Sequence, residues 1–266
     1  ITTYKSFVEE RGGSNDNPPF SLSDHVVIKA LVTIGDSEPE GLSELETENT
    51  GKIESVFSSM TPTSVDEDMT FEEFSTMVRR LFDEHSPELH DVILTMMLGY
   101  ASLGVASGAK KILKYAPGFN SEESYYQARA FASTRAEEAF QLIQSSTIRR
   151  LDSLFAEFKR GNGLSLSWLV EEIKKFFSVG RASLIATNES MVVVRYSEKL
   201  VFSNSKVVKL VRWFTAKDER VCSVCGPRHG RVYPLAAAPL APVHVGCRCA
   251  LLPMIDTRVI TEQLYV

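Results

Sequence analysis

The chain has 266 residues, of which 44% are hydrophobic and 24% charged, and its formal net charge is −5 at pH 7. These values are ordinary for a globular protein of one or two domains. No run of 18 apolar residues occurs, and the first 19 residues lack the apolar core of a signal peptide, so we expect no membrane partner.

The net charge conceals an asymmetry along the chain. Residues 1–100 hold 20 Asp and Glu against 6 Lys and Arg, whereas residues 101–266 hold 14 acidic and 23 basic residues. Such polarity indicates either two surfaces of different sign, one of them suited to acidic partners, or a solvated acidic segment beside a slightly basic domain.

Residues 1–68 are predicted to form an acidic N-terminal tail and linker with one short helix. The opening 20 residues include the stretch GGSNDNPP, which has two adjacent prolines and no periodic apolar face. Residues 22–34 form a short apolar segment that favours the helix. Residues 35–68 are rich in Ser, Thr, Glu and Asp, which predicts an irregular acidic linker.

Residues 69–180 predict a helical body of long amphipathic helices. Residues 70–73 have the pattern of a capping box, and Ser86-Pro87 predicts the start of a second helix because Pro favours the first helical position. A long helix from about residue 121 to 160 and a shorter one over 166–176 carry apolar residues three and four positions apart. The face predicted to be core is rich in Phe: Phe155, Phe158, Phe176 and Phe177.

Residues 181–266 predict a small α+β module. Residues 181–200 fit a helix, although the β-branched stretch at 191–194 is ambiguous. Short strands are predicted at residues 206–214, 231–233 and 249–253. The predicted fold class is therefore α+β, mostly α, with an N-terminal helical body and a small C-terminal α+β zinc-binding module.

All four cysteines lie within 28 residues of this module, as Cys222-Ser-Val-Cys225 and then His244-Val-Gly-Cys247-Arg-Cys249. A Cys-x-x-Cys turn followed some twenty residues later by a His/Cys/Cys group has the spacing of a tetrahedral zinc site. Five ligands are offered for four places. We expect Cys222, Cys225 and Cys247 to bind a structural Zn²⁺, with His244 or Cys249 completing the site.

Two other interpretations of this cluster remain open. His229 lies four residues past Cys225 and is a weaker candidate ligand. The four cysteines could instead form two disulfides or stay reduced, although disulfide frameworks are typical of small secreted domains with insufficient cores.

The residues around the cluster have a specific order. They read WFTAKDERVCSVC over 213–225, GRV over 230–232 and PVHVGCRCALLP over 242–253. This order resembles the C-terminal signature of phage minor head proteins, the head-morphogenesis family that includes the Mu F-like proteins. Upstream, RASLIATNE at 181–189 resembles that family's Arg-Ala-x-x-Ile-Ala-Arg-Thr-Glu helix. Val245 stands where the family has Pro, and Thr187-Asn188 stands where it has Arg-Thr.

The resemblance implies a structural virion component of a tailed phage that acts in head assembly, DNA packaging or ejection. Its expected partners are the portal protein and the major capsid protein or capsid interior, and its expected location is the virion, with the host cytoplasm during assembly. A basic patch is a candidate contact for packaged DNA, for an acidic portal surface or for solvent alone. The patch consists of Lys206, Lys209, Arg212, Arg220, Arg228 and Arg231.

Two other functions compete with this one. A metal-dependent nuclease would use His229 or His244, with Asp218 and Glu189 as possible partners. A zinc-ribbon nucleic-acid module would explain the cluster and the basic patch, but not the helical body. The sequence contains no His-Glu-x-x-His, deaminase or phosphate-loop motif, and a closed cysteine-rich site leaves a metal no open position, so we expect no enzyme.

Overall fold

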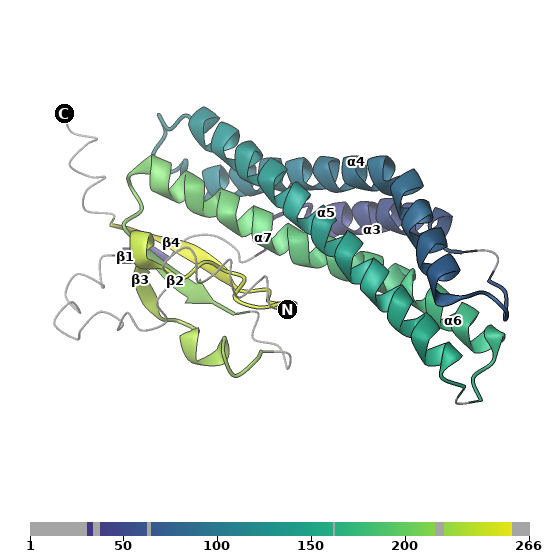
Figure 1. The fold of residues 1–266 in the computed structure, drawn as a ribbon. Helices are drawn as coiled ribbons and strands as arrows, with labels where there is room; N and C mark the ends of the chain where they lie inside the picture. Colours follow the sequence, from purple (N-terminus) through teal and green to yellow (C-terminus); the bar gives the residue numbers. More distant parts are fainter. Residues whose placement is uncertain (1–30, 34–37, 63–64, 162, 216–220, 257–266) are drawn as a thin grey trace. The chain divides into compact units, whose positions relative to one another are not determined.

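The protein is mostly helical, with a small antiparallel sheet formed largely by its C-terminal part (Figure 1). A computed structural model describes residues 31–33, 38–62, 65–161, 163–215 and 221–256. The elements in chain order are β1 (Leu31–Thr33), α3 (Leu42–Ser59), α4 (Phe71–Ile112), α5 (Glu122–Lys159), α6 (Leu166–Phe176), α7 (Val179–Ser205), β2 (Leu210–Phe214), η2 (Gly226–Arg228), β3 (Val232–Pro234), η3 (Leu235–Ala237) and β4 (Ala250–Asp256). The predicted fold class is confirmed.

Two compact units make up the chain, and neither follows chain order. Unit 1 comprises Ile1–Leu42, Tyr100–Phe131 and Asn188–Val266, and unit 2 comprises Ser43–Gly99 and Ala132–Thr187. The boundaries between the units fall within α4, α5 and α7 and after the first residue of α3. The consecutive division at residues 68 and 180 rests on composition rather than on packing, and it stays a prediction.

Helix α3 stands where the sequence predicts an irregular linker. Its Ile53, Val56 and Phe57 are at most 1% exposed, and they share one face of the helix. The polar residues do not interrupt it, because a hydroxyl such as that of Thr50 donates to the carbonyl four residues earlier. The linker prediction for residues 42–59 is therefore wrong: the abundance of Ser, Thr and Glu obscured a narrow apolar face.

Helix α4 is continuous where the sequence predicts a new start at Ser86-Pro87. Pro87 lies inside the helix and has no N–H for the carbonyl of Asp83. The Ser86 hydroxyl donates to that carbonyl at 3.1 Å, so the acceptor that Pro87 leaves free still has a partner. At the start of α4 the capping box is confirmed, since Thr70 N donates to Glu73 Oε2 at 2.8 Å and Glu73 N donates to Thr70 Oγ1 at 3.2 Å.

Helix α4 is relevant to the expectation that the protein has no membrane partner. By length and composition alone it is apolar enough to cross a membrane, and 44% of that apolar stretch is buried. Several of its large apolar side chains belong to the protein core, among them Leu89, Ile93 and Met97, none of which is exposed. Packing accounts for these residues, and the absence of a membrane partner stays a prediction.

Aromatic side chains contribute to the core of unit 2, and of the four Phe residues predicted there Phe155 and Phe177 are buried while Phe158 and Phe176 are half-buried. Phe74 stacks on Phe155 with ring centroids 4.2 Å apart, and Phe57 meets the edge of Phe177 at 5.6 Å. Arg181 lies among these rings. Its guanidinium carbon is 4.8 Å from the Phe57 ring centroid, and burial lowers its pKa to about 10. The first residue of the motif at 181–189 is thus part of the core of unit 2.

The sheet of unit 1 has the strand order β1-β4-β2-β3, with every neighbouring pair antiparallel (Figure 1). In β2, Val211 and Trp213 are fully buried on one face, which confirms the predicted alternation. The predicted helix over 22–34 is wrong at its end, because residues 31–33 pair through their backbone with β4 as strand β1. Residues 22–30 lie outside the described part of the chain.

Helix α7 packs closely against α4 within unit 1. A Cβ built on Gly104 would lie 2.6 Å from the carbonyl oxygen of Val194, and one on Gly108 would lie 2.9 Å from Cβ of Val201. Only glycine allows two backbones to approach this closely. The same interface holds a buried carboxylate, Glu198, which accepts hydrogen bonds from α4 and α7. Its donors are Ser107 at 2.7 Å, Lys111 at 2.5 Å and Arg195 at 2.9 Å.

Candidate metal centre

Two tight turns in unit 1 present the candidate ligands. In the first turn, Cys225 N and Gly226 N donate to the Cys222 carbonyl at 3.2 and 2.9 Å, so both cysteines lie on the same bend. In the second, Cys247 N donates to the His244 carbonyl at 3.1 Å. The second turn needs Gly246, whose φ of +75° lies in the left-handed region. The local sequences therefore form the two ligand pairs before any ion is considered.

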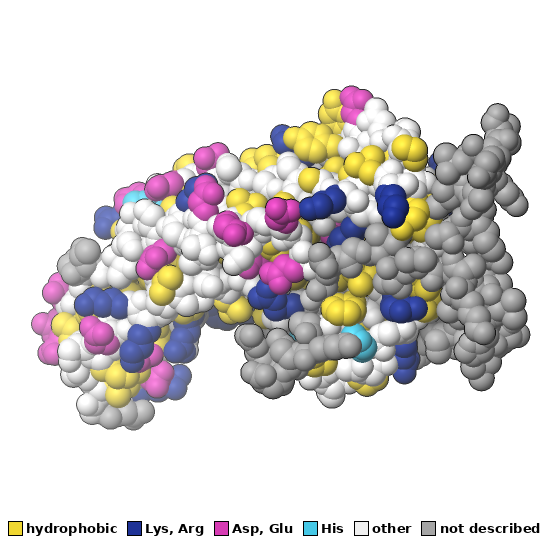
Figure 2. All heavy atoms as spheres, turned by 180° about the vertical axis from the view of Figure 1, so that it is seen from behind, with side chains coloured by type: hydrophobic (Ala, Val, Ile, Leu, Met, Phe, Trp, Pro, Cys, Tyr) yellow, Lys and Arg dark blue, Asp and Glu magenta, His cyan; other side chains and the backbone are white. Residues whose placement is uncertain are grey.

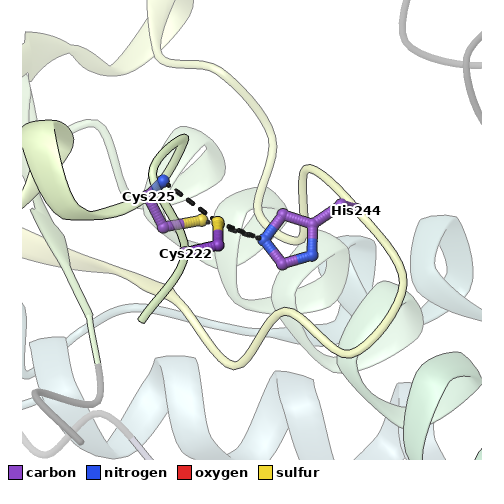
Figure 3. A group of neighbouring side chains, drawn as sticks. All are labelled: Cys222, Cys225 and His244. Carbon is purple, nitrogen blue, oxygen red and sulfur yellow. Dashed lines mark hydrogen bonds between the residues drawn. The ribbon is translucent and has the colours of Figure 1, made fainter. Parts of the chain in front are cut away.

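The two turns bring their donor atoms together (Figure 3). Nε2 of His244 is 3.0 Å from Sγ of Cys222 and 3.2 Å from Sγ of Cys225. Sγ of Cys225 is 3.7 Å from Sγ of Cys247. The donors form two groups of three, Cys222-Cys225-His244 and Cys225-Cys247-Cys249. Within each group the donor atoms all lie within 4.8 Å of one another, and Cys225 belongs to both groups.

The Cys225–Cys247 distance fits one edge of a tetrahedral thiolate site. With Zn–S bonds of about 2.3 Å, two sulfurs on one tetrahedron are about 3.8 Å apart, close to the 3.7 Å between Cys225 and Cys247. The two distances from His244 Nε2 to a sulfur are a few tenths of an ångström shorter than the sulfur–nitrogen separation expected around a tetrahedral Zn²⁺. All four cysteines are free thiols, so the disulfide interpretation has no support in this structure. The cluster is a set of groups that could hold a metal ion.

The His244 ring has the tautomer that a metal ligand needs. Its Nδ1 lies 2.8 Å from the carbonyl oxygen of Val245, which can only accept a hydrogen bond. Nδ1 therefore carries a proton, and Nε2 faces the two sulfurs of the Cys-x-x-Cys turn, where it is the ligand atom of the neutral ring. His244 is thus oriented toward the cluster by its own turn.

The thiols of the cluster differ in acidity because they share protons. A hydrogen bond from the Cys249 thiol lowers the pKa of Cys247 to about 5. Burial, together with the charge of Cys247, raises the pKa of Cys225 to about 12. The bond to Cys247 and burial also raise the pKa of Cys249. A divalent cation at these sulfurs would displace their protons, so metal binding here would release protons.

His229, the weaker candidate ligand, lies outside both groups of donors. Its Nδ1 accepts a hydrogen bond from the backbone N–H of Thr215 at 3.1 Å and lies 2.9 Å from the Thr215 hydroxyl. The ring also packs 5.2 Å from that of Phe214. His229 therefore fixes the end of β2. Asp218 and Arg220, which the motif includes, lie outside the described residues.

The basic patch is only partly described. Lys206, Lys209 and Arg231 are exposed, and Arg212 and Arg228 are half-buried. The Arg228 guanidinium carbon lies 5.7 Å from the ring centroid of Trp213. The sixth member, Arg220, belongs to the segment outside the described residues. On the face seen in Figure 2, Lys and Arg (dark blue) occur together with Asp and Glu (magenta).

Two residues near the cluster were not singled out from the sequence as contacts of the site. Asn188 Oδ1 accepts a hydrogen bond from Gly246 N at 2.7 Å, which ties the second ligand turn to α7. Arg248, between two candidate ligands, donates to Glu38 Oε1 at 2.7 Å. Asn188 is a position at which the chain departs from the family pattern, and that departure is the only sequence signal for its role. Nothing in the sequence pairs residues 38 and 248.

Comparison with known proteins gives one match. Residues 157–252 match the family model described as Phage Mu protein F like protein. The matched segment runs from the end of α5 to β4 and contains all five candidate ligands. No curated protein and no solved structure matches the chain.

Proposed function

We propose that this chain, which belongs to the Phage Mu protein F like family through residues 157–252, is a structural phage head protein whose C-terminal module is folded around a zinc ion. The observation that carries the proposal is the position of the Cys/His cluster inside the matched segment, with donor distances that suit a tetrahedral ion. A metal in such a small module supplies folding free energy rather than chemistry.

The proposed ligands are Cys222, Cys225, His244 and Cys247. Contacts of 3.0 to 3.7 Å link the four in the order Cys222, His244, Cys225, Cys247, and Cys225 belongs to both groups of three donors. Cys249 follows Cys247 by two residues and would lie beside the site, where its thiol can donate to the Cys247 sulfur. When bound, the ion would join the Cys-x-x-Cys turn to the segment that leads into β4.

Metal analysis of the purified chain tests this ligand set. We expect one Zn²⁺ per chain, lost in Cys222→Ser and Cys225→Ser and retained in Cys249→Ser. Equal loss in all three variants would place Cys249 among the ligands. A wild-type chain that binds no zinc, and whose folding is unaffected by a chelator, would refute the metal centre.

Within the phage, we propose that the protein associates with the portal and the capsid interior and acts in head assembly, DNA packaging or ejection. Support comes from the family membership alone. Co-expression with a portal protein of the same phage and isolation of the portal ring tests the association, with an unrelated ring as the control. Absence of the chain from purified virions would contradict the role in the head.

The nuclease alternative gains no support from the described residues. His229 is engaged by Thr215, and His244 is directed at the cysteine sulfurs. A zinc-ribbon role in nucleic-acid binding rests on the basic patch, whose salt dependence is considered below.

A further inference from the structure

Helix α7 holds the ligand-bearing segment at two points. Asn188 Oδ1 accepts from the backbone N–H of Gly246 at 2.7 Å, and Lys199 Nζ donates to the carbonyl of Ala238 at 3.0 Å. The two side chains are eleven residues apart, which is about three helical turns, so they project from the same face of α7. The segment that leads to His244 and Cys247 is therefore attached along one side of this helix.

The Asn188 contact acts directly on the geometry of the ligands. Gly246 lies between His244 and Cys247, and its N–H donates to the Asn188 side chain of α7. A side-chain oxygen at this point fixes the rotation of the turn. That rotation sets where the imidazole and the thiolate point.

Helix α7 is a firm support for these contacts. Its other side packs at close range on Gly104 and Gly108 of α4 and carries the buried Glu198 with its Ser107 and Lys111 partners. Lys199 is itself partly buried, and burial lowers its pKa below the usual value. A helix held in this way can transmit a fixed position to the turn that it contacts.

We propose that Asn188 and Lys199 are positioning residues for the metal centre, through which α7 preorganises His244 and Cys247 for the ion. The inference rests on the metal centre proposed above. Neither residue is a ligand. Partners that orient metal ligands in this manner typically contribute about 10- to 100-fold to metal affinity.

The test is the Zn²⁺ affinity of the full-length chain, measured by competition with a chromophoric chelator. We expect Asn188→Ala to weaken binding by about 10- to 100-fold, with unchanged helix content by circular dichroism. Co²⁺ substitution gives a second readout, because the tetrahedral d–d bands should lose intensity when the second turn is free to rotate. Asn188→Asp keeps an acceptor oxygen and should restore most of the intensity.

A matched control comes from the same helix. Asn204 donates to Ser124 Oγ and Gln127 Oε1, away from the ligand turns, so Asn204→Ala should leave the Zn²⁺ affinity unchanged. Lys199→Met, which keeps the apolar stem and removes the bond to Ala238, should weaken binding several-fold. If Asn188→Ala does not fold, the Zn²⁺ affinity of Lys199→Met tests the positioning role of α7 instead.

The possible failures are distinguishable. A wild-type chain that binds no Zn²⁺ overturns the metal centre and this inference with it. Tight binding by the wild type, together with Asn188→Ala or Lys199→Met variants that fold and bind within about twofold of it, overturns the positioning role alone.

Discussion

Glu198 is a buried carboxylate that neutralises two cations from different helices. Its side chain is 2% exposed, and Lys111 of α4 and Arg195 of α7 both lie within ion-pair distance. Burial by itself would raise the pKa of Glu198, but the charges of Arg195 and Lys111 outweigh it, and the pKa is lowered. Loss of this single charge would leave two buried cations facing each other.

We therefore predict that Glu198→Gln destabilises the protein by about 3–5 kcal/mol, the typical effect of breaking a buried ion pair from one side. Urea unfolding followed by circular dichroism measures the free energy. Glu172→Gln is the control, because its partner Lys175 is exposed to solvent, which screens the pair, so its loss should destabilise the protein far less. Equal effects of the two substitutions would contradict the structural role of the network.

The same carboxylate predicts a loss of stability in acid. Since the pKa of Glu198 is lower in the folded state than its ordinary value of 4.5, its contribution is fully present above pH 4.5. That contribution is lost as the pH falls from 4.5 through the folded-state pKa. Urea titrations between pH 7 and 3 should show a steeper decline for the wild type than for Glu198→Gln. Parallel curves would exclude this assignment.

At the scale of elements, α4 contains proline and glycine residues that disfavour a helix, and contacts with neighbouring groups compensate for them. Pro87 stays within α4 because Ser86 supplies a donor to the freed carbonyl. Gly104 and Gly108 are poor helix formers, yet they let α7 approach α4 closely. From the sequence, each of these residues could either end the helix or allow another helix to pack closely against it. The neighbouring groups in the folded protein decide which of the two occurs.

Two glycines of α4 provide a direct test of this packing. A Cβ on Gly104 would lie 2.6 Å from a backbone oxygen of α7, so Gly104→Ala should destabilise the protein by about 1–3 kcal/mol. A Cβ on Gly99 would lie 3.7 Å from Leu45, an ordinary contact, so Gly99→Ala should stabilise the protein by up to about 1 kcal/mol through helix propensity. Thermal and urea unfolding measure both. A stabilising Gly104→Ala would show that α7 does not approach α4 so closely.

At the scale of the whole molecule, the candidate metal ligands and most of the helical core lie in different units. The five candidate ligands are in unit 1, and the stacked rings of Phe74 and Phe155 are in unit 2. The chain has two tryptophans, and they report on the units separately. Trp213 is fully buried in β2 of unit 1, and Trp168 is half-buried in α6 of unit 2.

We expect removal of the metal to unfold the sheet of unit 1 and to leave unit 2 helical. In a Trp168→Phe variant, a chelator should shift the Trp213 emission to longer wavelength, because the indole becomes exposed to water. In a Trp213→Phe variant, the Trp168 emission should stay constant. Most of the far-ultraviolet helix signal should persist in both. Coincident loss of both signals would show that the two units unfold as one.

DNA binding by the basic patch is a further whole-molecule prediction. If its five described members each neutralise one phosphate, the logarithm of affinity for duplex DNA should fall against the logarithm of salt concentration with a slope of about −4 to −5. Lys209→Ala with Arg231→Ala should reduce the slope by about 2. The matched control is Lys52→Ala with Arg80→Ala in unit 2. A slope near zero would leave the patch as a solvated or protein-facing surface.

Much of the local structure was predictable from the sequence because it depends on neighbours in the chain. The capping box at Thr70, the bounds of α5 and α6 and the alternation of β2 follow from side-chain spacing alone. The Cys-x-x-Cys bend was equally local and was predicted, whereas the second ligand turn, with Gly246 at positive φ, was seen only in the structure.

What the sequence by itself determined was a helical protein with a Cys/His cluster and a phage head signature, since these depend on residue type and spacing. Only the tertiary structure decided that residues 42–59 are a helix, because their apolar face is narrow and becomes visible only when buried. Spacing predicted that the two ligand pairs meet, but only the tertiary structure showed that His244 lies against Cys222 and Cys225, and only it attached the second turn to Asn188. The Asn188 contact links residues 58 positions apart, and no spacing motif connects such a pair.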